Sequence, residues 1–590
     1  MDVKKDIIND LYKSTCAVVL LSILAAAIGN AIDGMIIGNF LGSNSIAAFG
    51  FTIPYQKFVM IFPSTLALGM QIICTKKLSA GKIDESNGVF SLAMGLAMVL
   101  EFAFLAGVFI FPEQIASLLG VPENEGGGGV RAEVIDYLQA FSLGLPAMAF
   151  VIISIPVMQL DSDRQRTVTA IMIESVTNVV GDLLNVFYLD AGMWGIGLAT
   201  SASYFVAAAF LAMHFFKTES QFKFSPANIK IAELKNILLN GMGPALGRAA
   251  SMLQANFLNH VAVGIGGTAS VAALAIWNNL LSLIETLPKS QAQAIQQISG
   301  MLIGESDRTS ILRLAKIAIK FSLQVSLLVA VILIFAAPLI VNLYISGEDI
   351  EVTTMSVEAV RWMAMTLAVM AINQILYYFY AAYGRFTLVS ATAVADNILF
   401  IVPLVLVMTH FFGVTGIWAA FLLSKLAMLL AIIVGVWIYN RKISFRLEDL
   451  LLLSEDFGSP KNPQINVTVT SQKEVEKLSE QVQNFCENNG IDGKRSLRAA
   501  ICIEEMARNI VEHGFADGKK HSVDIRVIIQ GDEVTIRLRD DCRPFNPKKW
   551  HEIHNPENKT DNIGVRMVFA IARDVKYISI LKLNCLIIKI

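Results

Sequence analysis

The stretch NAIDGMIIGNFLGSNSIAAFGFTIP, residues 30–54, joins two apolar segments of the chain. Asp33 is the one carboxylate in the first segment of this stretch, and Gly42 separates the two segments. Helices commonly end at glycine, because glycine adopts backbone conformations that other residues avoid. The stretch therefore predicts two consecutive helices joined by a tight turn, with a charge inside the first helix.

A similar stretch, VAVGIGGTASVAALAIW, occupies residues 261–277 in the second half of the chain. Gly267 aligns with Gly42, and residues 271–273 (Val-Ala-Ala) align with residues 46–48 (Ile-Ala-Ala). The match predicts an internal repeat of two halves. Membrane transporters built from such repeats place their binding site at the interface between the halves.

The apolar composition places most of the chain in a membrane. Of 590 residues, 54% are hydrophobic and 16% are charged, whereas soluble domains carry about 25% charged residues. A helix that crosses a bilayer needs about 20 mainly apolar residues. Residues 1–445 predict twelve such helices in two six-helix halves, about 1–222 and 238–445. The twelve are centred near residues 26, 63, 100, 145, 178, 205, 251, 285, 330, 369, 401 and 427.

The distribution of lysine and arginine predicts the orientation. These residues gather in the N-terminal segment and in alternate loops, and cytoplasmic loops carry such an excess. Both termini are therefore expected in the cytoplasm. The net charge of −2 argues against nucleic acid as a partner.

Polar side chains inside the apolar segments form the first candidate site. A charged side chain at mid-bilayer costs about 2.5–3.5 kcal/mol on insertion scales, so each one needs a reason. Asn178 and Asp182 are four residues apart and share a helix face. Together with Asp33 and Thr200 they offer the oxygen ligands that Na⁺ prefers, or carboxylates that share a proton. The alternative is hydrogen-bonded packing between helices.

Other charged residues of these segments have less specific roles. Glu285 and Lys289 are one helical turn apart and are expected to pair. Asp396 is expected to line a cavity between the halves. Arg248, near the end of the seventh segment, is expected to extend its side chain to the membrane surface.

Residues 1–445 resemble the multidrug and toxic compound extrusion (MATE) family. The resemblance is carried by residues 30–54, by the repeat, and by TNVVGDLLNVFYLDAGMWGIGLATSAS, residues 177–203. It implies a V-shaped bundle in the plasma membrane of a prokaryote that exports small cationic or amphipathic molecules in exchange for Na⁺ or H⁺. In one prokaryotic branch the pattern of the cation site matches Asp33, Asn178, Asp182 and Thr200.

A soluble domain is expected to follow the apolar segments. Residues 446–463 contain Ser, Gly, Pro and Asn and predict a cytoplasmic linker. From 464 to 590 the pattern predicts a strand, two helices, two strands paired at 522–530 and 533–540, a helix over 564–575 and two final strands. These elements predict a two-layer α+β sandwich.

The helix IEEMARNIVEHGF, residues 503–515, carries the second candidate site. Glu505, Asn509 and His513 recur every four residues on one face. A carboxylate and an amide one turn apart suit hydrated Mg²⁺, which takes few protein ligands. The alternative is a solvated helix face with incidental charges.

The C-terminal domain resembles the GHKL-type, histidine-kinase-like ATPase fold, in particular the anti-sigma-factor serine kinases. The resemblance implies ATP with Mg²⁺: Glu505 as the catalytic base, Asn509 holding the metal, Asp540 reading adenine, and Gly564 near the phosphates. Cys542 and Arg566 stand where the family has glycine, and Arg566 is a candidate phosphate partner.

Together these features predict a Na⁺- or H⁺-coupled exporter with a cytoplasmic nucleotide-binding regulatory domain. Membrane lipids, and a cytoplasmic regulatory protein bound to this domain, are the expected partners. The alternative is a membrane-tethered serine/threonine kinase whose helical bundle acts as a sensor. Whether the domain has enzymatic activity is left open by the two altered motifs.

Overall fold

The computed structural model describes residues 7–590, apart from 80–81, 123–128, 162, 217–219, 221, 346–348, 455, 459–461, 516–520, 544, 548–562 and 581–582. The chain forms two compact units. The larger comprises residues 18–293 and 319–444, and the smaller comprises residues 1–17, 294–318 and 445–590. Each unit is described by itself below.

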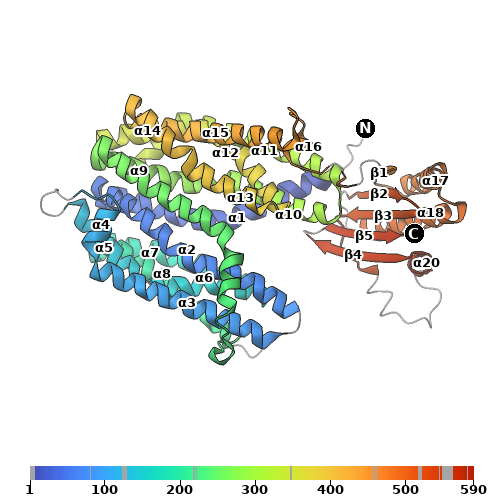
Figure 1. Ribbon diagram of the computed structural model, residues 1–590, viewed down its shortest axis with the longest axis horizontal. Helices are drawn as coiled ribbons and strands as arrows, with labels where there is room; N and C mark the ends of the chain where they lie inside the picture. The colour runs from blue at the N-terminus through green and yellow to red at the C-terminus, as the bar shows by residue number, and fades with distance from the viewer. Residues whose placement is uncertain are drawn as a thin grey trace. The chain divides into compact units, whose positions relative to one another are not determined.

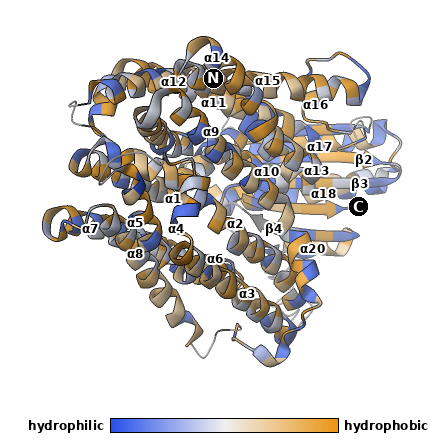
Figure 2. Cartoon of the chain, turned by 60° about the vertical axis from the view of Figure 1, so that its left-hand side comes forward, coloured by the Kyte–Doolittle hydropathy of each residue, from blue (hydrophilic) through white to orange (hydrophobic). Residues whose placement is uncertain are grey.

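The larger unit is a bundle of apolar helices (Figures 1 and 2). Some of its helices end in π-helical turns, at Ile37–Leu41, Asn185–Leu189 and Ala395–Leu399. The helices from the N-terminus onward are α1 (Ile7–Ile36), α2 (Ser43–Ser79), α3 (Ile83–Ile110), α4 (Pro112–Leu118), α5 (Val130–Ser142), α6 (Leu145–Leu160), α7 (Arg164–Leu184), α8 (Gly192–Phe215), α9 (Glu233–Ile284), α10 (Thr286–Gly304), α11 (Arg308–Asn342), α12 (Ile350–Ala382), α13 (Phe386–Val394), α14 (Ile401–Phe412) and α15 (Thr415–Asn440).

The predicted repeat has a backbone counterpart. Gly42 and Gly267 both have positive φ, 94° and 60°, with extended ψ of −177° and −153°. Gly42 ends the turn before α2, and Gly267 breaks α9 at the corresponding place. Only glycine adopts these angles without steric cost. The same backbone device therefore recurs at the aligned glycine of each half.

The number of membrane crossings stays a prediction. By length and composition, the described residues contain nine helices that could cross a membrane, or ten if the bent pair α5 and α6 forms one crossing. One of the nine is the 60-residue segment Ala245–Gly304, which contains the break at Gly266–Gly267. About 20 residues suffice for one crossing, so this segment is long enough for two.

The smaller unit contains a five-stranded antiparallel sheet in the order β1-β2-β3-β5-β4. Helices cover one face of the sheet (Figure 1), where Ile536 and Leu538 join the apolar core. The short helix α16 (Leu447–Leu450) precedes the sheet. The other elements are β1 (Gln464–Val469), α17 (Gln472–Asn488), α18 (Gly493–Asn509), β2 (Val523–Gln530), β3 (Glu533–Asp540), α20 (Ile563–Ile571), β4 (Asp574–Ile580) and β5 (Leu583–Lys589).

The expected sandwich agrees with this sheet, but the helix predicted over 564–575 ends earlier. α20 stops at Ile571, and residues 574–580 form β4. The alternating sequence DVKYISI pairs along its whole length with β5. Because sheet pairing satisfies every second backbone group of this edge strand, it overrides the apolar pattern that favoured helix.

Candidate functional sites

Asp33 of α1 and Asn178 of α7 are joined by a hydrogen bond within the helical bundle. Asn178 Nδ2 donates to Asp33 Oδ1 at 2.8 Å. One turn later on α7, Asp182 interacts electrostatically with Asp33. The structure therefore brings three of the four predicted cation-site residues together.

Three acceptor oxygens of this cluster, two of Asp182 and one of Asn178, lack donors within the described part of the chain. Asp182 is 0% exposed. Among the described residues, neither of its carboxylate oxygens nor Oδ1 of Asn178 has a hydrogen-bond partner. A buried carboxylate without a partner is costly, so a proton or a bound cation must compensate its charge. The donor set of carboxylate and amide oxygens fits a hard cation such as Na⁺.

The helices around the cluster are closely packed and locally irregular. A Cβ on Gly181 would lie 2.7 Å from Cβ of Ala199, so α7 and α8 are in close contact beside Asp182. The π-helical turns Ile37–Leu41 and Asn185–Leu189 follow α1 and α7 directly. Single π-helical turns are frequent at functional sites.

Two tyrosines complete this cluster and had no signal in the sequence. Tyr137 of α5 is 2% exposed and interacts with both Asp33 and Asp182. It also interacts with Thr200, whose Oγ1 donates to Ile196 O at 3.2 Å. Tyr204 of α8 interacts electrostatically with Asp33. Thr200 therefore reaches the cluster beside Tyr137, and its own hydroxyl proton is directed to the helix backbone.

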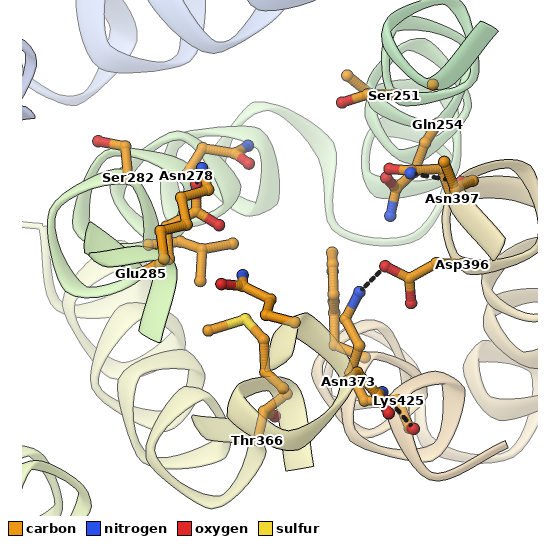
Figure 3. A pocket seen from close by; sticks show the side chains of 18 of the residues that line it. Ser251, Gln254, Asn278, Ser282, Glu285, Thr366, Asn373, Asp396, Asn397 and Lys425 are labelled. Atoms are coloured by element: carbon orange, nitrogen blue, oxygen red, sulfur yellow. Dashed lines mark hydrogen bonds and ion pairs between the residues drawn. The ribbon is translucent and has the colours of Figure 1, made fainter. Parts of the chain in front are cut away.

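A cavity of about 670 Å³ lies elsewhere in the bundle. Residues of α2, α9, α10, α12 and α15 line it, together with the π-helical turn Ala395–Leu399 (Figure 3). Its size falls in the range of small-molecule sites. The cavity is the candidate substrate site of the bundle.

Both carboxylates of the cavity wall are paired with lysines. Lys289 Nζ donates to Glu285 Oε1, as the one-turn spacing predicted. Lys425 Nζ donates to Asp396 Oδ2 at 2.6 Å, and Figure 3 shows the two side chains pointing toward each other. Lys425 had no signal in the sequence, because its partner lies 29 residues away on another helix.

The expectation that Arg248 extends to the membrane surface stays a prediction. The structure places Arg248 in the cavity wall. On α9 it precedes Ser251 and Gln254 at intervals of three residues, and both of these also line the cavity. Residues so spaced share one helix face, so Arg248 lies on the face of α9 that lines the cavity.

Asp540, the predicted adenine-reading residue, lies at the end of β3 and is 5% exposed. Its Oδ1 accepts hydrogen bonds from Cys542 N at 3.0 Å and from Asn584 Nδ2 at 2.8 Å. Burial raises the pKa of Asp540, although these hydrogen bonds oppose the shift. These two hydrogen bonds orient the carboxylate, and both are accepted by its Oδ1 atom.

The structure also brings Glu505 and Gly564 together. A Cβ on Gly564 would lie 2.0 Å from Glu505 Oε2, so a larger residue at this position would displace the Glu505 carboxylate. Both oxygens of Glu505 also lie 3.2 Å from a terminal nitrogen of Arg508. Asn509 ends α18, and His513 lies in the π-helical turn Ile510–Gly514.

The two residues that replace glycine have different surroundings. Cys542 is 7% exposed and fills the space beside Gly514, where a Cβ on Gly514 would lie 2.8 Å from its Sγ. Arg566 lies in the first turns of α20, two residues after Gly564. The residue types of the motifs, carboxylate, amide and glycine, are ones that suit Mg²⁺ and a nucleotide, and Cys542 occupies the space beside Gly514.

An ion-pair network on the second face of the sheet was not foreseen. Arg526 of β2 and Arg537 of β3 are direct cross-strand partners, and Arg539 follows on the same face. Asp307, 1% exposed, pairs with all three arginines, and Glu305 pairs with Arg537 and Arg539. Burial alone would raise the pKa of Asp307, but Arg537 and Arg539 hold it well below its ordinary value.

The comparisons with known proteins agree with both parts of the chain. The sequence profile of the MatE family matches residues 19–184 and 244–407, and that of the Histidine kinase-like ATPase domain matches residues 469–590. The chain is similar to the multidrug export protein MepA of Staphylococcus aureus (strain MSSA476). The two are 22% identical over 452 residues, which cover 73% of this chain and 94% of MepA.

Solved structures share the fold of the helical bundle. An inward-facing multidrug resistance MATE family transporter of the MOP superfamily aligns with a TM-score of 0.65 at 20% identity, covering 74% of this chain and 99% of that one. A MOP superfamily transporter from Pyrococcus furiosus, described by the reverse polarity of its binding pocket, aligns with a TM-score of 0.58 at 19% identity, covering 75% and 98%. Because the MatE profile matches both halves of the bundle and more than half of all residues, the chain belongs to the MatE family, with a C-terminal histidine kinase-like ATPase domain.

Proposed function

We propose that this protein is a secondary active exporter of small amphipathic molecules, driven by Na⁺ or H⁺ entry and regulated by nucleotide at its C-terminal domain. It acts in the plasma membrane of a prokaryote, with both termini in the cytoplasm. Family membership and the similarity to MepA, a multidrug export protein, support export. The excess of basic residues in alternate loops supports the orientation.

The observation that carries ion coupling is the set of donor-free acceptors at Asp182 and Asn178, beside Asp33. A proton or Na⁺ at this cluster removes the cost of the buried charge. Binding and release of the cation then change the charge between three helices, α1, α7 and α8. Such a change in charge can bias the bundle between two arrangements.

The C-terminal domain is proposed to bind ATP with Mg²⁺. Asp540 would accept from the adenine amino group, Asn509 would hold the metal, and Gly564 and Arg566 would lie near the phosphates. When bound, Mg²⁺ neutralises phosphate charge. The chain's own residues contribute orientation: Cys542 N and Asn584 hold the Asp540 carboxylate in one position.

The buried ion-pair network supports a regulatory role for this domain. Glu305 and Asp307 directly follow α10, whose first turn contains the cavity residue Lys289. With Asp524 they balance the charge of the three arginines. Removing one partner of a buried pair is strongly destabilising, so the segment after α10 and the sheet move as one body. A change in the sheet domain is thereby transmitted to α10.

A membrane-tethered serine/threonine kinase is the alternative function. The ion pair between Glu505 and Arg508 favours nucleotide binding over catalysis, because it engages the carboxylate that the family resemblance assigns as the catalytic base. A regulatory protein bound to this domain remains compatible with either function.

The test is transport by the full-length protein in proteoliposomes. Efflux of a fluorescent amphipathic dye is measured with a Na⁺ gradient, a H⁺ gradient or neither, and with or without Mg-ATP on the side of the C-terminal domain. The proposal expects flux only with one of the gradients, and a rate that changes with Mg-ATP. Gradient-independent flux would remove ion coupling, and flux indifferent to ATP in a protein that binds ATP would remove regulation.

A further inference from the structure

The charges of the cavity wall do not cancel. The described lining residues include two carboxylates, Glu285 and Asp396, and each of them is already paired with a lysine. The wall contains four cationic side chains in all: Lys57, Arg248, Lys289 and Lys425. Two positive charges therefore remain in excess.

The two cations in excess lie around one serine. Lys57 Nζ of α2 donates to Ser251 Oγ of α9 at 3.0 Å. Arg248 lies one turn before Ser251 on the same face of α9. Arg248 is exposed, and within the described part of the chain no ion pair or hydrogen bond is found for it. The Lys57 ammonium and the Ser251 hydroxyl thus meet in the cavity wall, and Arg248 lies one turn from Ser251 on the same helix face.

The remaining wall is amphipathic. Figure 3 shows Asn278, Ser282 and Glu285 on the side of the cavity opposite Asp396 and Asn397. The amides of Asn278 and Asn397 and the hydroxyl of Ser282 both donate and accept hydrogen bonds. Apolar side chains also line the cavity, among them Trp277, Phe421, Leu258, Met363 and Met370. Trp277 stacks on Trp418 at 5.3 Å and packs on Phe421 at 5.0 Å, which makes this part of the wall rigid.

We propose that the cavity binds amphipathic organic anions, with an oxyanion head group at Arg248, Lys57 and Ser251 and an apolar body against Trp277 and Phe421. The proposal rests on the proposed function only in taking this cavity as the export route. It departs from the organic cation that the family resemblance implies, and the charged residues of the wall are the reason.

The physical basis is compensation of charge in a poorly solvated site. A guanidinium binds carboxylate, sulfonate or phosphate oxygens through two parallel hydrogen bonds, and such charge-assisted bonds are the stronger ones. An organic cation would find attraction at the aromatic rings. It would also face a wall with two more cations than carboxylates, and both carboxylates that could receive it are held by lysines.

The experiment compares two dyes of one scaffold, fluorescein (a dianion near neutral pH) and rhodamine 123 (a monocation). Equilibrium binding to the purified full-length protein in detergent is followed by fluorescence polarisation, without any ion gradient. Fluorescein is expected to bind at least about tenfold more tightly. Arg248→Gln should weaken fluorescein binding by roughly tenfold or more, the effect of losing a charge-assisted hydrogen bond, and leave rhodamine 123 unchanged or improved.

Lys57→Gln provides a second, independent variant with the same expected direction. Arg361→Gln is the matched control, because Arg361 is an exposed arginine of α12 outside the cavity wall. Tighter binding of rhodamine 123, no binding of fluorescein, or an equal loss in Arg361→Gln would overturn the proposal. Since binding needs no gradient, a protein that binds fluorescein but lacks ion-driven flux would contradict the proposed function and leave this inference standing.

Discussion

The hydroxyl oxygen of Tyr137 accepts a hydrogen bond from Nε2 of Gln56 at 3.2 Å. Gln56 lines the cavity, and Tyr137 interacts with Asp33 and Asp182 of the cation cluster. One hydrogen bond therefore joins a wall of the candidate substrate cavity to the proposed coupling site. Such a contact gives the two sites a physical route by which occupancy of one affects the other.

Tyr137→Phe removes this hydrogen bond and keeps the ring. Ion-driven efflux should fall by roughly fivefold, the effect of about 1 kcal/mol, because the link between the sites is lost. Binding of substrate without a gradient should be unchanged. Both are measured on reconstituted protein. Tyr55→Phe is the control, since Tyr55 OH also makes a buried hydrogen bond, to Ser142 Oγ at 3.1 Å, outside both sites. An equal loss of efflux in both variants would contradict a specific role for Tyr137.

Asp182→Asn removes the unpartnered charge of the cluster without changing its shape. Ion-driven efflux should fall to the level of protein-free liposomes, and Asp33→Asn should do the same. The Tm of Asp182→Asn should be equal to or above that of the wild type, because an uncompensated buried carboxylate is removed. In the wild type the coupling cation should stabilise the protein, which is measured as a rise in Tm with Na⁺ or with falling pH. In Asp182→Asn this rise should be absent.

Glu101→Gln is the matched control for this cluster. Glu101 is 0% exposed on α3, and in the described part of the molecule its carboxylate oxygens also lack partners. Its loss should leave the cation dependence of Tm and of efflux intact. If Glu101→Gln removed the cation effect while Asp182→Asn retained it, the coupling site would be assigned wrongly.

Asp307→Asn is expected to loosen the network between Asp307 and the three arginines of the sheet. Breaking a buried ion pair typically costs about 3–5 kcal/mol, because the opposite charges stay buried. Hydrogen exchange of β3 amides in the full-length protein should therefore speed up, and the effect of Mg-ATP on efflux should shrink. Because the folded-state pKa of Asp307 is lowered, its stabilisation is present above pH about 4 and is lost as pH falls below that value.

Glu448→Gln is the corresponding control. Glu448 pairs with Arg308 at 2.6 Å, but its side chain is 46% exposed. Exposed pairs contribute about 0–1 kcal/mol, so exchange in β3 and the ATP response should stay close to the wild type. Unchanged exchange in Asp307→Asn would show that the network does not hold the sheet to this segment.

The sequence predicted the features that depend on local spacing. The one-turn pairs Asn178 and Asp182, and Glu285 and Lys289, share helix faces because helical periodicity requires it. The glycine break at residue 267 followed from its alignment with residue 42. Strand and helix order in the C-terminal domain followed from alternating and helical patterns, except where β4 replaced the end of a helix.

The features that were missed depend on contacts between distant parts of the chain. Tyr137 and Lys425 meet their partners across helices, and no local pattern marks them. Asp307 had no signal in the sequence, because the three arginines that pair with it lie far along the chain on two strands of the sheet.

Asp540→Asn tests the nucleotide site through its pH dependence. An ionised Asp540 accepts a hydrogen bond from the adenine amino group, whereas the protonated form loses acceptor capacity. Burial raises the pKa of Asp540 above its ordinary value of about 3.9. ATP affinity should thus be full above this raised pKa and fall toward a tenfold loss per pH unit below it.

Titration calorimetry of the full-length protein measures the ratio of wild-type to Asp540→Asn affinity at each pH, so that titration of the ATP phosphates cancels. The ratio should exceed about ten near neutral pH, the value of a hydrogen bond to a charged group, and decline toward one in acid. A ratio of one at every pH, with ATP still bound, would remove Asp540 from the site.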